Sequence, residues 1–147
     1  MIPQLRIPTT GFKISKPFGT KGKFWKTGFH TGVDFPTPTG TPVKAAWGGI
    51  ISRAHNAGDG FGLYVRQDCF WRGCSFRVYY AHLYRVFVKP GDEVAIGDLL
   101  AESGASGNVV ASSPDSDGSH LHMELRVFDD AKKEWVRTEP KFFDEET

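Results

Sequence analysis

Four of the five histidines of this chain lie in three short strings, and their types and spacing suit a metal site. The strings are FHTGVDF with His30, YYAHLY with His82, and SHLHMEL with His120 and His122. Asp34 follows His30 by four residues. Two imidazoles and one carboxylate, with two imidazoles to spare, fit a catalytic zinc site better than a structural one, which normally has four protein ligands, mostly thiolates.

The chemistry of such a site would be hydrolysis. Zinc held by two neutral histidines and one carboxylate keeps a net charge of about +1 and lowers the pKa of a bound water from about 15.7 toward roughly 7. Attack of the resulting hydroxide on an amide also needs a proton acceptor, an oxyanion donor and a proton for the leaving amine. Imidazoles suit these steps because they titrate near physiological pH. Since residues two apart on a strand point the same way, one of His120 and His122 can bind metal while the other faces water or substrate.

The composition predicts the elements that position these side chains. The chain has 147 residues with 17 glycines, 9 prolines and 14% aromatic residues, which favours many short strands and tight turns in one domain spanning residues 1–147. A formal net charge of +1 gives no reason to expect a nucleic-acid partner. No stretch approaches the roughly 20 apolar residues of a membrane span, and the N-terminus does not read as a secretory signal.

Strand alternation is clearest in HLHMELRVF. His120, His122 and Glu124 fall on one face there, and Leu121 and Met123 fall on the other, which is a core face. We expect Glu124 to be a solvent-facing carboxylate in preference to a group that orients a metal ligand, because exposed strand carboxylates are the commoner case.

Further strands are expected where alternating or apolar runs are bounded by turn residues. The expected strands are residues 42–54, 60–68, 75–85, 93–95, 99–103 and 120–128. In the third of these, His82 shares a face with Val78, Tyr80 and Tyr84. The final KKEWVRTEPKFF is expected to wrap back across the sheet.

Two cysteines and the fifth histidine lie outside the proposed site. Cys69 and Cys74 flank what reads as a hairpin tip in DCFWRGC. A cross-strand disulfide is possible there, and two unpaired thiols are equally compatible with the sequence. His55, beside a turn in RAHNAGDG, is predicted to be a loop histidine without a role in the site.

At these residues the chain resembles the lysostaphin and LytM-type zinc endopeptidases, which cut peptide cross-links in bacterial cell walls. Their signature, H-x-x-x-D followed much later by H-x-H, stands here as HTGVD and HLH, and the resemblance extends from PFG to EPKFF. It implies that His30, Asp34 and His122 bind one zinc ion and that His82 and His120 are the catalytic pair. The implied fold is an antiparallel, barrel-sandwich-like β-sheet whose groove carries the zinc between walls of loops.

The resemblance also implies a partner, bacterial peptidoglycan, and we expect a monomer. The stretch between SGASG and SHLH is longer than the short connection usual in the family, which should alter one wall of the groove. Phe24, Trp25 and Tyr84 are candidate substrate contacts on these walls. A stand-alone domain with an initiator Met and no signal resembles a phage lysin or virion-associated lysin, made in the cytoplasm and acting on the wall after release.

Three other readings compete with an active zinc peptidase. Some relatives have lost ligands and serve as binding or activator modules, but all five site positions are intact here. An iron oxygenase would use the same two-histidine, one-carboxylate ligand types, and the two extra histidines argue against it. A lipoyl-like carrier domain is suggested by GDEVAIGDLL, but it needs a lysine at the hairpin tip, where this chain has Ala95 and Ile96.

Overall fold

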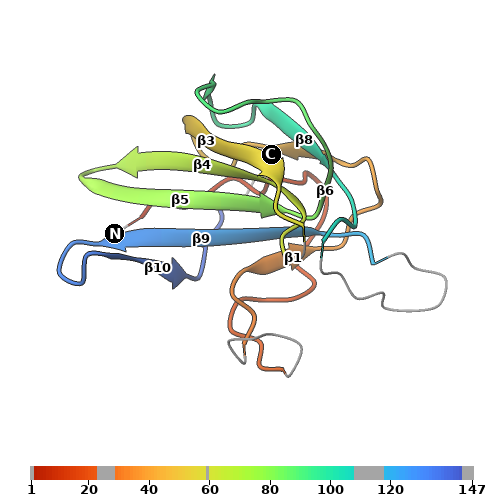
Figure 1. Ribbon diagram of the computed structural model, residues 1–147. Coiled ribbons are helices and arrows are strands. Elements are labelled where there is room, and N and C mark those ends of the chain that lie inside the picture. Colours follow the sequence, from red (N-terminus) through yellow and green to blue (C-terminus); the bar gives the residue numbers. More distant parts are fainter. Residues whose placement is uncertain (1, 23–28, 59, 108–117, 144–147) are drawn as a thin grey trace.

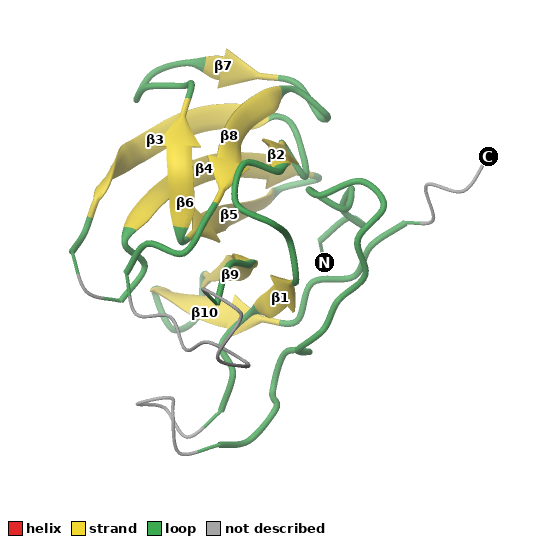
Figure 2. Cartoon of the chain, turned by 90° about the vertical axis from the view of Figure 1, so that its right-hand side faces the viewer, coloured by secondary structure: helices red, strands yellow, loops and turns green. Residues whose placement is uncertain are grey.

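The computed structural model describes residues 2–22, 29–58, 60–107 and 118–143. These residues form strands and loops with no helix among them, as Figure 2 shows, so nothing described could cross a membrane as a helix. The strands are β1 (Val33–Phe35), β2 (Pro42–Lys44), β3 (Gly49–Asn56), β4 (Leu63–Trp71), β5 (Cys74–Ala81), β6 (Leu83–Val86), β7 (Glu93–Val94), β8 (Leu99–Ser103), β9 (Leu121–Asp129) and β10 (Glu134–Thr138). The predicted mainly β, antiparallel fold is confirmed.

The larger of two sheets is organised around β9. Its strand order is β1-β9-β5-β4-β3-β7, and β10 also pairs with β9. Figure 1 shows the long strands β4, β5 and β9 running side by side. One side of β9 pairs with β5, while its other side pairs first with β1, opposite Leu121–Met123, and then with β10, opposite Leu125–Asp129. Glu124 therefore lies at the junction between β1 and β10.

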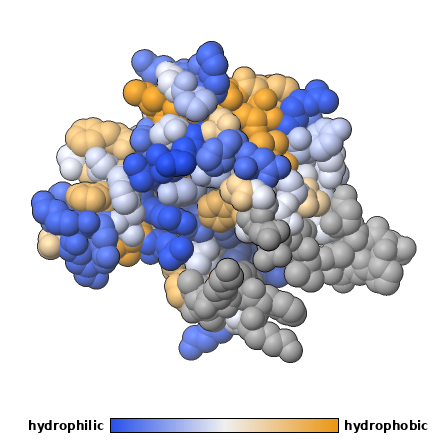
Figure 3. Space-filling view, in the orientation of Figure 1, coloured by the Kyte–Doolittle hydropathy of each residue, from blue (hydrophilic) through white to orange (hydrophobic). Residues whose placement is uncertain are grey.

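One hydrophobic core lies between this sheet and a smaller sheet of order β2-β8-β6. Every second residue of the long strands contributes, and each such side chain stabilises the fold by roughly 1.5–3 kcal/mol. Fully buried examples are Val65, Phe76, Val78, Leu121, Met123 and Leu125, which meet Val43, Leu83 and Leu100 from the smaller sheet. The opposite face of the long strands carries polar side chains beside a small buried cluster of Tyr64, Tyr79 and Ala81, and Figure 3 shows hydrophilic side chains across the middle of that view. His122 projects from this second face.

The expected strand 75–85 is in fact two strands in different sheets. β5 ends at Ala81 and β6 begins at Leu83, because His82 between them has a left-handed backbone with a φ of 62°. This conformation is uncommon for residues other than glycine and reverses the strand geometry. The expectation that Tyr80, His82 and Tyr84 share a face is therefore wrong, since Tyr80 is buried in the core and Tyr84 is exposed.

The other strand predictions hold to different degrees. Residues 99–103 coincide with β8, 93–95 contain β7, and 60–68 and 120–128 overlap β4 and β9 with shifted ends. The expected strand 42–54 is wrong as one element, because β2 joins the smaller sheet and β3 the larger one. β1 was not predicted, while the C-terminal segment does return to the sheet as β10.

The hairpin between β4 and β5 explains the state of the two cysteines. Its turn is Arg72-Gly73, both with positive φ, which matches the right-handed twist of paired strands. The register sets Cys74 opposite Trp71 and Cys69 opposite Phe76, so the two sulfurs are not partners across the ladder. Both cysteines are free thiols, and burial, together with the nearby Asp68, raises the pKa of Cys69 to about 12.

Candidate metal centre and active site

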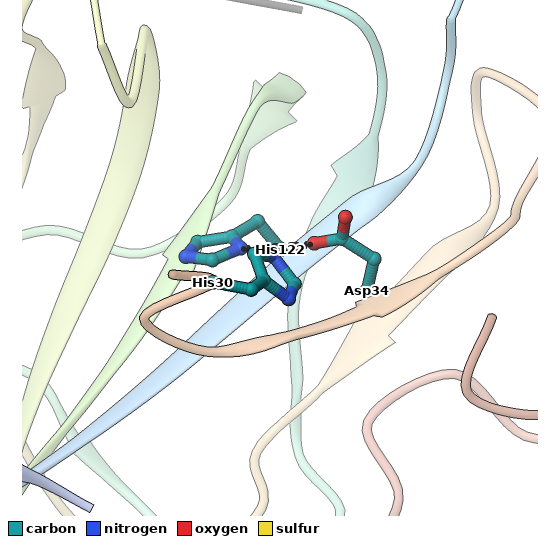
Figure 4. Close-up of side chains that lie close together, drawn as sticks. All are labelled: His30, Asp34 and His122. Atoms are coloured by element: carbon teal, nitrogen blue, oxygen red, sulfur yellow. Dashed lines mark hydrogen bonds and ion pairs between the residues drawn. The ribbon is translucent and has the colours of Figure 1, made fainter. Parts of the chain in front are cut away.

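Three buried side chains, one on β1, one on the adjacent β9 and one just before β1, converge on one point. Asp34 on β1 lies directly opposite His122 on β9, and His30 stands just before β1 (Figure 4). His30 Nε2 is 3.1 Å from Asp34 Oδ1 and 3.2 Å from His122 Nδ1, and the last two atoms are 2.9 Å apart. The three residues form a group that could hold a metal ion.

The second ring nitrogen of each histidine shows which atoms are available to a metal. His30 Nδ1 is 3.1 Å from the carbonyl oxygen of Pro17, and His122 Nε2 is 3.4 Å from Glu124 Oε1. Carbonyl and carboxylate oxygens only accept, so these two nitrogens carry the hydrogens. The lone pairs of His30 Nε2 and His122 Nδ1 then point at the same place, and a cation must separate them.

The spacing of the three ligand atoms fits zinc. Tetrahedral coordination at about 2.0–2.1 Å places neighbouring ligand atoms about 3.3 Å apart. The observed separations of 2.9 to 3.2 Å lie within a few tenths of an ångström of that value. Because three protein ligands leave a position open, the donor set is of the catalytic type and not of the closed structural type.

Electrostatic interactions keep the carboxylate of the trio ionised. Burial alone would raise the pKa of Asp34, but its side-chain contacts with His122 and His30, together with the electrostatic attraction of His122 and His120, outweigh burial and hold that pKa well below its usual range. Burial lowers the pKa of His122, yet the hydrogen bonds to Asp34 and Glu124 raise it overall to about 9. Without a metal, His122 therefore carries a second ring proton at neutral pH.

The two remaining site histidines lie together beside this trio. The ring centroids of His82 and His120 are 4.9 Å apart, and His120 Nε2 is 3.8 Å from Asp34 Oδ2. Each ring donates its Nδ1–H to a backbone carbonyl at 2.8 Å, His82 to Ser106 and His120 to Gly118, so each Nε2 is left to exchange protons. Burial and repulsion from His120 lower the pKa of His82 to about 4, which makes His82 neutral at pH 7.

Ser106 fixes the strained backbone at His82. Its hydroxyl accepts from Leu63 N at 3.0 Å and donates to the carbonyl of Leu83 at 2.7 Å, which ties β4 to the residue after His82. Gly62 makes this approach possible, because a Cβ there would lie 2.5 Å from the backbone of Ser106. The sequence interpretation missed Ser106, although the small residues of GASG are the kind that allow such close loop contacts.

Glu124 differs from its prediction. It is 1% exposed instead of facing solvent, and its Oε1 lies 3.4 Å from His122 Nε2. The cause is its place at the junction of β1 and β10, where Thr31 and Arg137 reach it from both neighbouring segments. His55 is also misassigned, because it lies on β3 with its ring against Tyr64 and not in a loop.

The predicted substrate contacts are only partly described. Phe24 and Trp25 lie outside the described residues. Tyr84 is 57% exposed and stands two residues after His82. Phe61, whose ring centroid is 5.8 Å from that of His122, is a further aromatic side chain at the site.

A β-sheet domain in which a His-Asp-His cluster could hold a metal with one coordination position free, beside two further histidines, has the side chains that a metal-dependent hydrolase requires. Residues 28–135 match the model of Peptidase family M23, and the chain belongs to this family of metallopeptidases.

Individual relatives agree with this assignment. The chain is 31% identical over 127 residues to the peptidoglycan DD-endopeptidase ShyC of Vibrio cholerae, covering 84% of this chain and 27% of that protein. Its structure resembles the catalytic domain of the antimicrobial peptidase lysostaphin from Staphylococcus simulans, with a TM-score of 0.72, 30% identity, and coverage of 90% and 91% of the two chains. It also resembles a mutant catalytic domain of the prophage-encoded M23 protein EnpA from Enterococcus faecalis, with a TM-score of 0.69, 27% identity, and coverage of 89% and 90%.

Proposed function

We propose that this protein is a zinc-dependent endopeptidase that hydrolyses peptide bonds in the cross-links or bridges of bacterial peptidoglycan. The observation that carries the proposal is the convergence of His30, Asp34 and His122, with His82 and His120 beside them. The names of ShyC and lysostaphin, a peptidoglycan endopeptidase and an antimicrobial peptidase, support the substrate class. The chain spans only about a quarter of the length of ShyC, so the substrate is inferred from this one region.

Different residues of the chain would bind the metal and transfer protons. A zinc ion at the trio supplies Lewis acidity that makes water a nucleophile at neutral pH. His82 Nε2 accepts the proton of that water, because its Nδ1–H is held by the Ser106 carbonyl and the ring is neutral at pH 7. His120, next to the Asp34 carboxylate, can carry a second proton and donate it from Nε2 to the oxyanion or the leaving amine.

The function is tested on a suspension of purified cell walls. The protein should clear the suspension, lose this activity to a chelator and regain it with zinc, and metal analysis should find zinc. Binding to walls without hydrolysis would instead establish a binding or activator module. Stoichiometric iron in protein purified without added metal would defeat the zinc assignment.

Zinc binding should release a proton at neutral pH. The pKa of His122 in the metal-free protein is about 9, above its ordinary value of 6.5, so the extra proton is bound below about pH 9 and must leave when the metal binds. The apparent zinc affinity should rise up to about tenfold per pH unit and level off above about pH 9. Calorimetry at pH 7.5 in buffers of different ionisation enthalpy counts the proton, and zero protons released would contradict the assignment.

Replacing Ser106 with alanine should slow hydrolysis without affecting the metal. Two hydrogen bonds around His82 are lost, so wall clearing should slow by about 10- to 100-fold, and the free energy of unfolding should fall by about 1–3 kcal/mol. Ser52→Ala is the control, since the Ser52 hydroxyl also links neighbouring segments away from the site: it accepts from Arg66 Nε and lies within hydrogen-bond distance of the Arg66 carbonyl and of Asp68. Equal loss of activity in both variants would reduce Ser106 to a purely structural role.

We also propose that residues 1–147 act as one peptidase domain. A second proposal concerns the route: the protein reaches the cell wall in the manner of a phage lysin. Leu5 pairs with Phe142 near the other end of the chain and is buried in the shared core. The likeness to the prophage-encoded EnpA supports the second point. Expression inside a bacterium should leave cells intact until the membrane is permeabilised, and lysis without permeabilisation would contradict this route.

A further inference from the structure

We infer that Glu124 is a positioning residue that orients the metal ligand His122 from the side opposite the metal. The inference rests on the proposed metal site and extends it to residues that do not touch the metal. Glu124 Oε1 lies 3.4 Å from His122 Nε2, and the same oxygen accepts a hydrogen bond from the Thr31 hydroxyl at 2.7 Å. Thr31 directly follows His30, so this one oxygen is linked to the segments of both histidine ligands.

The other oxygen of Glu124 is held by two arginines. Arg126 Nε donates to Oε2 at 2.5 Å, and Arg137 Nε donates to it from β10 at 3.3 Å. A carboxylate with 1% exposure is costly to bury without such partners. With both oxygens bound, the carboxylate group cannot rotate away from the His122 ring.

The ring of His122 is confined on its other sides as well. A Cβ at Gly32 would lie 2.9 Å from His122 Cε1, so the backbone before β1 packs directly on the ring, and Phe61 stacks at a tilt nearby. Glu124 accepts the hydrogen bond from His122 Nε2–H. The Nδ1 of the same ring therefore faces Asp34 and His30, where the metal would bind. A carboxylate partner of this kind also raises the basicity of the ligand nitrogen.

The same face of the sheet provides a control carboxylate that has similar partners but no histidine contact among those described. Asp68 on β4 accepts from Arg77 Nε at 3.1 Å and from the Ser52 hydroxyl at 2.9 Å. Like Glu124 it is bound by an arginine and a hydroxyl, but none of the contacts described for it involves a site histidine. The Asp68 side chain is 43% exposed, whereas that of Glu124 is 1% exposed, so the loss of Asp68 reports the effect of removing a carboxylate paired with arginine but not with a histidine.

Zinc affinity separates positioning from stability. Glu124→Gln should bind zinc about 10- to 100-fold more weakly than the unchanged protein in competition with a chromophoric chelator. Asp68→Asn should bind zinc as tightly as the unchanged protein. Equal affinity of Glu124→Gln and the unchanged protein, or an equal loss in Asp68→Asn, would overturn the inference.

A gentler variant covers the case in which Glu124→Gln fails to fold. Thr31→Val keeps the shape of the side chain and both arginine contacts but removes one hydrogen bond to the carboxylate, so zinc affinity should fall about two- to fivefold. Cobalt in place of zinc should also show altered visible d–d bands in this variant, because the His122 ring is less restrained. If Thr31→Val has the same zinc affinity and the same cobalt spectrum as the protein without substitutions, the inference is refuted. If the protein without substitutions binds no zinc, the proposed function itself is refuted.

Discussion

Asp34→Ala should release the metal and abolish wall hydrolysis. The carboxylate contacts both histidines of the trio, at 3.1 and 2.9 Å, and it is the only anionic member of the set. Losing it removes a ligand and the charge that favours a dication over a proton. The zinc affinity should therefore fall by more than the roughly 100-fold that the loss of an outer partner of a ligand costs.

The thermal midpoint distinguishes metal loss from misfolding. Zinc at 100 times its dissociation constant stabilises a folded protein by about 2.7 kcal/mol, so a chelator should lower the midpoint of the unchanged protein. Asp34→Ala should show a midpoint that neither zinc nor chelator moves, with an unchanged far-ultraviolet circular dichroism spectrum. His30→Ala should behave in the same way, and a zinc-responsive midpoint in either variant would contradict the ligand assignment.

The clustering of His30, Asp34 and His122 could be predicted from the sequence because it depends on local spacing. His30 and Asp34 are four residues apart at the start of one short strand, and His122 lies on a strand whose apolar alternation is unmistakable. The alternation of β9 also fixed correctly which of its residues face the core. Such features follow from the two-residue period of a strand and need no knowledge of distant partners.

The features that sequence reasoning missed depend on contacts between distant segments. The alternation of 75–85 continues through His82, and nothing local shows that the chain changes sheets there, because the left-handed backbone is imposed by Phe61 and Ser106. Glu124 looked like an exposed carboxylate because its burial requires Arg137, which lies on a strand that returns later in the chain. Both errors concern residues at the site. There the fold imposes a left-handed backbone and a buried carboxylate, which the residue types alone do not favour.

His120→Ala should retain zinc and lose activity. His120 stands outside the trio, with its Nε2 3.8 Å from the nearer Asp34 oxygen, whereas His122 Nδ1 is 2.9 Å from the other one. Removal of a group that transfers protons lowers the rate by about 10²- to 10⁴-fold without removing a ligand. His82→Ala should give a loss of the same order, again with the zinc in place.

The pair His120 and His122 supplies its own control, because the two residues differ by one step along the same face of the chain. His122→Ala should lose zinc and activity together, and added zinc should restore neither. In His120→Ala, metal analysis should give one zinc per chain. The rate of wall clearing should nevertheless stay about 10²- to 10⁴-fold below that of the original protein. Zinc lost from His120→Ala and kept in His122→Ala would exchange the two roles, which the 2.9 Å contact between His122 and Asp34 argues against.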